Sequence, residues 1–329
     1  MVKLRQARYC NLKLFLMYLT AYGHLIEPEI ERSALLIAQY RFIYLFHMPL
    51  FAFLTGLFLR DERSCGRQCR KMLLLYAPLQ LICTIFSGGS ISLLTPCWHL
   101  WYLLSSGVWA ALGGLWLRFG RARGRLPLLL LCIVAGCAAG YVPFIGRTLS
   151  LSRTIVFFPY FLCSLFCRAD TRWERLRPVG LIALVLVLVL MALWGRYIPA
   201  AFLYQAEPYG AVKNGFTLRL LCYLLGALCC LLCLAFVPSG RLPFTKAGAD
   251  TLPAYLIHAP LAALLRQAGL PPQLYPALAA LLLYIIFAAA RWCGGLYGIR
   301  STDRRDGTWP PFNRSTRNTP GRSTGSFSP

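Results

Sequence analysis

Long apolar stretches recur from one end of this chain to the other, separated by short segments that carry most of the charged residues. About 20 apolar residues suffice for a helix to cross a bilayer, and a helix satisfies its own backbone hydrogen bonds there. The pattern predicts an all-α integral membrane protein, a polytopic bundle of about ten transmembrane helices. The ten predicted spans are residues 12–26, 42–59, 72–87, 98–117, 126–142, 154–167, 179–195, 216–237, 251–268 and 273–293.

Composition and charge agree with this class. Hydrophobic residues make up 58% of the chain and charged residues 14%, whereas soluble proteins carry about 25% charged residues. The net charge of +23 could indicate a nucleic-acid partner. However, with the N-terminus in the cytoplasm, ten spans place 26 of the 34 Lys and Arg on the cytoplasmic side, in the loops and the two termini, as the positive-inside rule requires. We therefore expect a plasma or inner membrane protein with both termini cytoplasmic, in contact with the lipid bilayer and not with nucleic acid.

Residues 1–299 are expected to form the membrane domain. Residues 300–329, rich in Ser, Thr, Arg, Pro and Gly, are expected to form a disordered basic cytoplasmic tail. The fourteen Cys fall mostly in apolar runs, where they serve as small apolar residues, and no metal site is predicted. The first span contains Lys13 and His24 and lacks a small-residue cleavage site after it, so we do not expect a cleaved signal peptide.

All four histidines lie within or at the edge of predicted spans, where ionisable groups are costly and usually functional. On the alternating topology His24, His47 and His99 lie in the outer half of the membrane and His258 near mid-depth, which predicts one intramembrane polar site. Simpler interpretations exist for three of them. His24 could be interfacial, His47 could bond to a neighbouring helix, and His99 could belong to an aromatic belt.

Charged residues near these spans suggest further roles. Lys13 and His24 are eleven residues apart, which puts them on one helix face roughly 16 Å apart; the alternative for Lys13 is a snorkelling anchor. Glu27 could orient His24 if the helix continues past Pro28. Arg41 lies at the outer entry to the second span, where it could simply anchor the helix.

Arg67 and Arg70 form an R-x-x-R just before the third span. Paired guanidinium groups can bind phosphates, although the positive-inside bias alone also explains them. The sequence contains no P-loop, Rossmann glycine fingerprint, G-x-S-x-G or pair of catalytic carboxylates. The schemes of soluble hydrolases and phosphotransferases are therefore not expected.

Six short motifs follow one another in a definite order over residues 8–295. They are Asn11-Leu12-Lys13 through Gly23-His24, Phe46-His47-Met48-Pro49-Leu50-Phe51 into Thr55-Gly56, Arg67 with Arg70, Trp98-His99-Leu100-Trp101-Tyr102, Phe157-Phe158-Pro159-Tyr160-Phe161 and Tyr255-Leu256-Ile257-His258. Their order resembles the integral-membrane acyltransferase 3 family and, within it, the fucose 4-O-acetylase-like branch. The chain departs from the branch at Cys10, where the branch often has Asp beside the basic residue, and at Leu14 and Ser164, where it often has Gly.

The resemblance implies transfer of an acyl group, acetyl in most members, from cytoplasmic acyl-CoA to a hydroxyl of a cell-envelope glycan or lipid-linked sugar. It makes acetyl-CoA a co-substrate rather than a permanently bound cofactor. His24 would be the general base, and Lys13, Arg67 and Arg70 would bind the CoA phosphates. His47 and His258 would stabilise the oxyanion or position the acceptor. Glu27, Arg41 and His99 would also bind the acceptor.

Two other functions remain open from sequence. The first is transport or export of a glycan or a small polar molecule, because ten helices with a polar interior suit that task as well. The second is a membrane module that binds a ligand without turnover.

Overall fold

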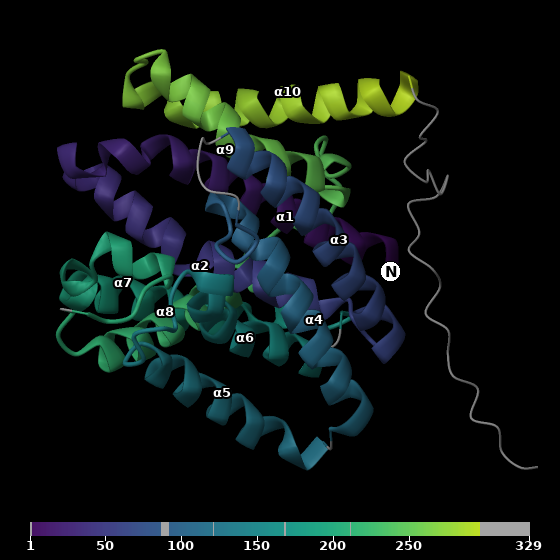
Figure 1. The fold of residues 1–329 in the computed structure, drawn as a ribbon, viewed down its shortest axis with the longest axis vertical. Coiled ribbons are helices and arrows are strands. Elements are labelled where there is room, and N and C mark those ends of the chain that lie inside the picture. The colour runs from purple at the N-terminus through teal and green to yellow at the C-terminus, as the bar shows by residue number, and fades with distance from the viewer. Residues whose placement is uncertain (1, 87–91, 121, 168, 211, 297–329) are drawn as a thin grey trace, which may run out of the picture. The chain divides into compact units, whose positions relative to one another are not determined.

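The computed structural model describes residues 2–86, 92–120, 122–167, 169–210 and 212–296. This part of the chain is helical and contains no strand, which confirms the predicted all-α class (Figure 1). Its α-helices are α1 (Val2–Ile26), α2 (Ala34–Leu57), α3 (Glu62–Phe86), α4 (Trp101–Phe119), α5 (Arg125–Ala139), α6 (Leu151–Phe166), α7 (Arg177–Trp194), α8 (Gly215–Phe236), α9 (Leu252–Gln267) and α10 (Tyr275–Leu296).

Seven helical segments are long and apolar enough to cross a bilayer, and they contain α2, α4, α5, α6, α7, α8 and α10. The protein is therefore a multi-pass membrane protein. Each of the ten predicted spans overlaps a helix, but α1, α3 and α9 do not meet the criteria of length and apolarity. The reasons are visible in their sequences: α9 has 16 residues, and the first halves of α1 and α3 are rich in Arg and Lys.

Several helices begin earlier than predicted. α1 begins at Val2 instead of residue 12, and α3 at Glu62 instead of 72. α2 begins at Ala34 instead of 42, where the side chain of Ser33 accepts a hydrogen bond from the Leu36 amide. The added parts of α1 and α3 are polar and basic, so hydropathy alone misplaced those two boundaries. The added part of α2 begins with the apolar residues 34–38, which the prediction left out of the span.

Residues 1–290 form one compact unit and residues 291–329 form a second. The predicted boundary at residue 299 and the predicted tail, 300–329, lie outside the described residues. Everything below concerns the first unit.

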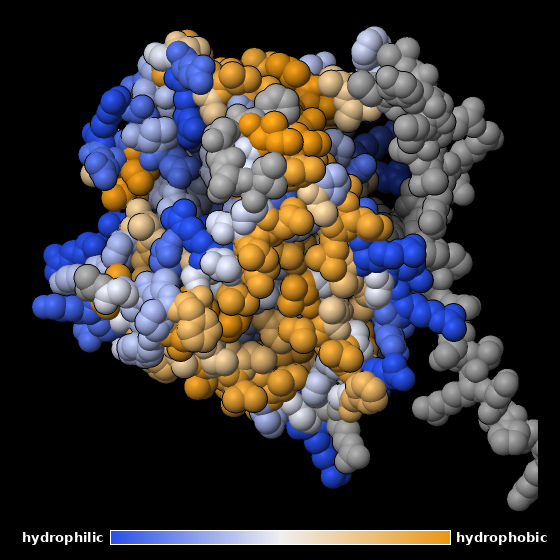
Figure 2. Space-filling model, in the orientation of Figure 1, coloured by the Kyte–Doolittle hydropathy of each residue, from blue (hydrophilic) through white to orange (hydrophobic). Residues whose placement is uncertain are grey.

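The helices differ in how much apolar surface they expose. Figure 2 shows apolar side chains gathered over a broad area of one face, with charged residues at its edges. Among the exposed apolar residues, Leu130 and Leu131 belong to α5, and Leu181, Ile182 and Leu188 belong to α7. Such exposure suits contact with lipid tails. α2 lies inside instead, where it packs against α1, α6 and α8.

The segment between α8 and α9 is bound to the first half of α1. Asn11 is buried, and its amide donates to the carbonyls of Pro238 and Gly240, both at 2.9 Å. The hydroxyl of Thr245 donates to the Asn11 side-chain oxygen at 2.5 Å. The ammonium of Lys13 donates to the carbonyl of Ala249 at 3.2 Å. These bonds hold the middle of α1 against this segment.

The crossing of α2 and α6 provides a stability test. A Cβ at Gly56 would lie 2.7 Å from the carbonyl oxygen of Phe161 and would also meet the Ser164 hydroxyl. Gly56→Ala should therefore force the helices apart and destabilise the protein by about 1–3 kcal/mol, the usual cost of overpacking. Thermal unfolding of the purified protein measures this.

Gly66→Ala is the matched control. Gly66 is exposed on α3, and nothing lies within 4 Å of a Cβ built there, so alanine should stabilise the helix by about 0.5–1 kcal/mol. Equal melting temperatures for the two variants would show that the Gly56 contact has no energetic weight.

Candidate functional site

Three histidines from distant parts of the chain gather at one place. His24 lies near the end of α1, His99 in the short 3-10 helix η2 (Trp98–Leu100), and His258 in the middle of α9. The ring centroids of His24 and His258 are 5.3 Å apart, and those of His99 and His258 are 5.5 Å apart. Trp98 lies beside them, with its ring 5.5 Å from that of His24.

Backbone carbonyls fix the tautomers of two of these imidazoles. His258 Nδ1 lies 2.7 Å from the Tyr255 carbonyl oxygen and 3.0 Å from that of Ala254, and His99 Nε2 lies 3.2 Å from that of Leu256. A carbonyl oxygen only accepts, so these nitrogens carry the hydrogen. Nε2 of His258 and Nδ1 of His99 are then lone-pair acceptors. Both are buried without a hydrogen-bond partner in the described structure.

Proline supplies the carbonyl that His99 uses. Pro260 lies inside α9 and has no N–H to donate, so the carbonyl four residues earlier, that of Leu256, loses its helical partner. His99 donates to this carbonyl across a separation of 157 residues in sequence. The break in the helix thus orients an imidazole on another element.

Glu27 orients His24. Helix α1 continues to Ile26 and passes directly into the 3-10 helix η1 (Glu27–Arg32), in which Pro28 occupies one of the first positions. Proline is tolerated there because the first N–H groups of a helix have no partner. Consequently Glu27 Oε2 lies 3.2 Å from His24 Nδ1. An ionised carboxylate only accepts, so Nδ1 carries the hydrogen and Nε2 keeps its lone pair.

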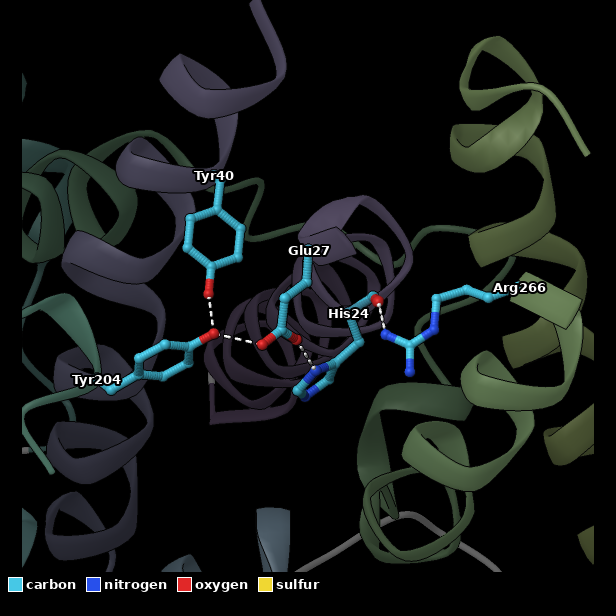
Figure 3. Close-up of polar contacts among 5 residues, drawn as sticks. All are labelled: His24, Glu27, Tyr40, Tyr204 and Arg266. Carbon is cyan, nitrogen blue, oxygen red and sulfur yellow. Dashed lines mark hydrogen bonds and ion pairs between the residues drawn. The ribbon is translucent and has the colours of Figure 1, made fainter. Parts of the chain in front are cut away.

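Other donors surround this pair (Figure 3). Tyr204, at the end of the 3-10 helix η7 (Ala200–Tyr204), donates to Glu27 Oε1. Arg266, near the end of α9, donates to the carbonyl oxygen of His24 at 2.9 Å. Burial raises the pKa of Glu27, but the hydrogen bonds from His24 and Tyr204 and the nearby charges outweigh it, so the pKa is below its ordinary value.

The fourth histidine, His47, is separated from His24 by the ring of Tyr44. His47 is buried in α2, and its Nδ1 donates to the carbonyl of Ile43, four residues earlier, at 2.8 Å. Its ring centroid is 4.8 Å from that of Tyr44, and the Tyr44 centroid is 6.5 Å from that of His24. The structure therefore groups His24, Glu27, His99 and His258 closely, and connects His47 to them through Tyr44.

The predicted basic residues lie elsewhere. Lys13 is half-buried on α1, near the charges of Lys71 and Asp250. Arg67 and Arg70 are exposed on the first half of α3. Arg41 is partly buried on α2, and its Nε has no partner among the described residues. None of these four contacts the histidine cluster in the described structure.

Sequence reasoning missed Tyr40, Tyr204 and Arg266. Tyr204 lies 177 residues from its partner Glu27, and Arg266 lies 242 residues from its partner His24. No local spacing in the sequence could therefore identify them. Trp98 and Tyr255 belong to two of the sequence motifs, but no role of their own was predicted for them. In the described part of the chain, no group of three or more His, Cys, Asp or Glu is placed to hold a metal ion.

Comparison with known proteins gives one match. A family model described as an acyltransferase domain (Acyl_transf_3) matches residues 14–293, which cover most of the chain and include the four histidines and Glu27. Lys13 lies one residue before the match. The match is to the family as a whole and does not single out a branch. Neither the curated proteins nor the solved structures gave a match.

The environment of Glu27 predicts a pH dependence. Because its pKa in the folded protein lies below the ordinary 4.5, the carboxylate stabilises the fold above that pH and stops doing so as the pH falls through the lower, folded value. Wild type should exceed Glu27→Gln in stability by about 1–3 kcal/mol at pH 6. The difference should shrink below about pH 4.5.

Thermal unfolding of both proteins from pH 3.5 to pH 7 measures this difference. Glu31→Gln, an exposed position in the same 3-10 helix, is the control and should follow wild type throughout. A difference between wild type and Glu27→Gln that widened on acidification would contradict the assignment of the carboxylate as the stabilising form.

Proposed function

Because the chain belongs to the acyltransferase 3 family, whose domain model covers most of its length, we propose that it is a membrane O-acyltransferase. The proposed donor is cytoplasmic acyl-CoA, with acetyl as the acyl group. The proposed acceptor is a hydroxyl of a cell-envelope glycan or lipid-linked sugar, and the proposed location is the plasma or inner membrane with both termini in the cytoplasm. The membership confirms the resemblance at the level of the family.

The observation that carries the proposal is the hydrogen bond between His24 and Glu27. Nδ1 of His24 is held by Glu27, which leaves Nε2 with a lone pair, as a general base requires. Nε2 would take the proton of the acceptor hydroxyl while the oxygen attacks the acyl carbon. As the C–S bond breaks, the proton would pass from Nε2 to the CoA sulfur, which leaves as the thiol. The Glu27 carboxylate would stabilise the imidazolium between these two steps.

The other two imidazoles support binding of the acceptor. Nδ1 of His99 and Nε2 of His258 are both lone-pair acceptors, so each can accept a hydrogen bond from a hydroxyl. A neutral imidazole cannot donate from such a nitrogen, and an oxyanion needs a donor. His258 was expected either to stabilise the oxyanion or to position the acceptor. Its tautomer supports the second role. The same argument holds for Nε2 of His47, since its Nδ1 donates to Ile43.

The proposed donor site includes Lys13, near the middle of α1. Lys13 is eleven residues before His24, roughly 16 Å along the helix axis. With the N-terminus in the cytoplasm, Lys13 and the exposed Arg67 and Arg70 would meet the CoA phosphates at the inner face. Lys71, whose charge acts on Lys13, adds to the same positive region. The arm of acyl-CoA would then run along α1 to bring the thioester to His24.

His24→Ala should reduce acyl transfer by about 10²- to 10⁴-fold at unchanged membrane abundance, because it removes the general base. Transfer of labelled acetyl from acetyl-CoA, in membranes that contain the native acceptor, measures the loss. Mass spectrometry of envelope glycans from cells with and without the protein would identify the product. A protein that moved a glycan across the membrane without any acyl donor would instead be a transporter.

Arg67→Ala should raise the KM for acetyl-CoA about tenfold and leave the rate at saturation nearly unchanged, because a phosphate contact contributes to binding and not to the chemical step. Arg123→Ala removes another exposed arginine that the topology places on the inner side, and it should have no effect. If purified protein binds no CoA derivative and Arg67→Ala changes nothing, the acyl-CoA assignment is wrong.

A further inference from the structure

Tyr40 and Tyr204 extend the contact between Glu27 and His24 into a chain of hydrogen bonds with one direction (Figure 3). The Tyr204 hydroxyl lies between Glu27 Oε1 and the Tyr40 hydroxyl. The ionised Glu27 has no hydrogen to give, so Tyr204 must donate to it. Tyr204 then has no hydrogen left for Tyr40, so Tyr40 must donate to Tyr204. Both phenols therefore donate toward the carboxylate.

The chain is assembled from three separate segments and is held firmly. Tyr40 is fully buried on α2, and its ring stacks on that of Tyr44 at a centroid distance of 4.0 Å. Arg153 on α6 donates to the backbone carbonyl of Tyr204 at 3.1 Å. Burial raises the pKa of the Tyr204 hydroxyl, and its bond to Glu27 raises it further, so the hydroxyl remains a donor.

The charged and titratable groups around Glu27 come from every neighbouring element. They are His24 on α1, Tyr40 and Tyr44 on α2, Tyr204 in η7 and Arg266 on α9. Among these, Tyr204 and His24 donate directly to the two carboxylate oxygens. Without Tyr204, the carboxylate would be left partly buried with only His24 as a direct partner, and its protonated form would be favoured.

We propose that Tyr204, supported by Tyr40, is a positioning residue that keeps Glu27 ionised and thereby holds His24 in the tautomer with the hydrogen on Nδ1. This proposal rests on the proposed function, because that tautomer is the one that offers Nε2 to an acceptor hydroxyl. A protonated Glu27 could donate to Nδ1, and the imidazole hydrogen would then be on Nε2. In that form His24 could no longer take a proton from the acceptor.

The test measures the tautomer directly. Nitrogen NMR of protein labelled with ¹⁵N-histidine distinguishes the two neutral forms, and the signal lost in His24→Asn identifies His24. Wild type should have the hydrogen on Nδ1 at pH 8. Tyr204→Phe should move part of the population to the Nε2-protonated form, and Tyr40→Phe should do so to a smaller extent. Glu27→Gln, whose amide can donate to Nδ1, should give the Nε2-protonated form.

Tyr22→Phe is the matched control. The Tyr22 hydroxyl, on α1, donates to Gln39 on α2 at 2.7 Å, so the variant removes a tyrosine hydrogen bond next to Tyr40 in the sequence without touching Glu27. It should leave the tautomer unchanged. Acyl transfer should fall about tenfold or more in Tyr204→Phe, the equivalent of one hydrogen bond to a charged group. The acidic limb of its pH profile should move to higher pH, whereas Tyr22→Phe should keep the wild-type profile.

Failure of this proposal and failure of the proposed function give different results. An unchanged tautomer and pH profile in both Tyr204→Phe and Tyr40→Phe would exclude the positioning role even if His24→Ala abolishes transfer. If the tautomer shifts in Tyr204→Phe but His24→Ala retains full transfer activity, the positioning role of Tyr204 stands and His24 is not the base. If Tyr204→Phe does not fold, Tyr40→Phe decides, because it leaves the direct bond to Glu27 in place.

Discussion

The partly buried carboxylate of Glu27 is the group around which this end of the protein is assembled. A buried charge is costly unless donors and opposite charges surround it. Here they come from the end of α1, from η7 and from the end of α9, three segments that no local interaction would bring together. Ionising one side chain therefore constrains the placement of distant helices, and the same contacts determine which nitrogen of His24 is free.

The composition of helix α1 reflects the polar side chains that it carries. Lys13 lies near its middle and His24 near its end, and its contacts with α2, α9 and the segment before α9 are extensive. It is less apolar than a helix that faces lipid, and it does not meet the criteria for an independent span. The lipid-exposed apolar residues are carried instead by helices such as α5 and α7. Such a helix can carry polar and charged side chains because its neighbours shield it from the bilayer.

The sequence predicted the class, the approximate positions of the helices and the gathering of the histidines, since apolar run length and the cost of ionisable groups in a bilayer are local properties. His99 showed the limit of such reasoning, because its position between Trp98 and Trp101 is equally typical of an interfacial belt. Only its bond to Leu256, on a distant helix, places it with His258. Tyr204 and Arg266 gave no signal at all, because their partners are set by tertiary packing.

Backbone carbonyls, one of them freed by Pro260, explain how neutral histidines can be oriented inside an apolar bundle. A helix normally satisfies its own carbonyls and offers none to a neighbouring side chain. Pro260 removes one helical bond and frees the Leu256 carbonyl, to which His99 donates, while His258, two residues before this proline, donates within its own turn. Each imidazole thus loses one nitrogen to the backbone and keeps a lone pair on the other. The polar chemistry of the site is built from backbone groups and neutral rings, so apart from Glu27 and its partners it requires little buried charge.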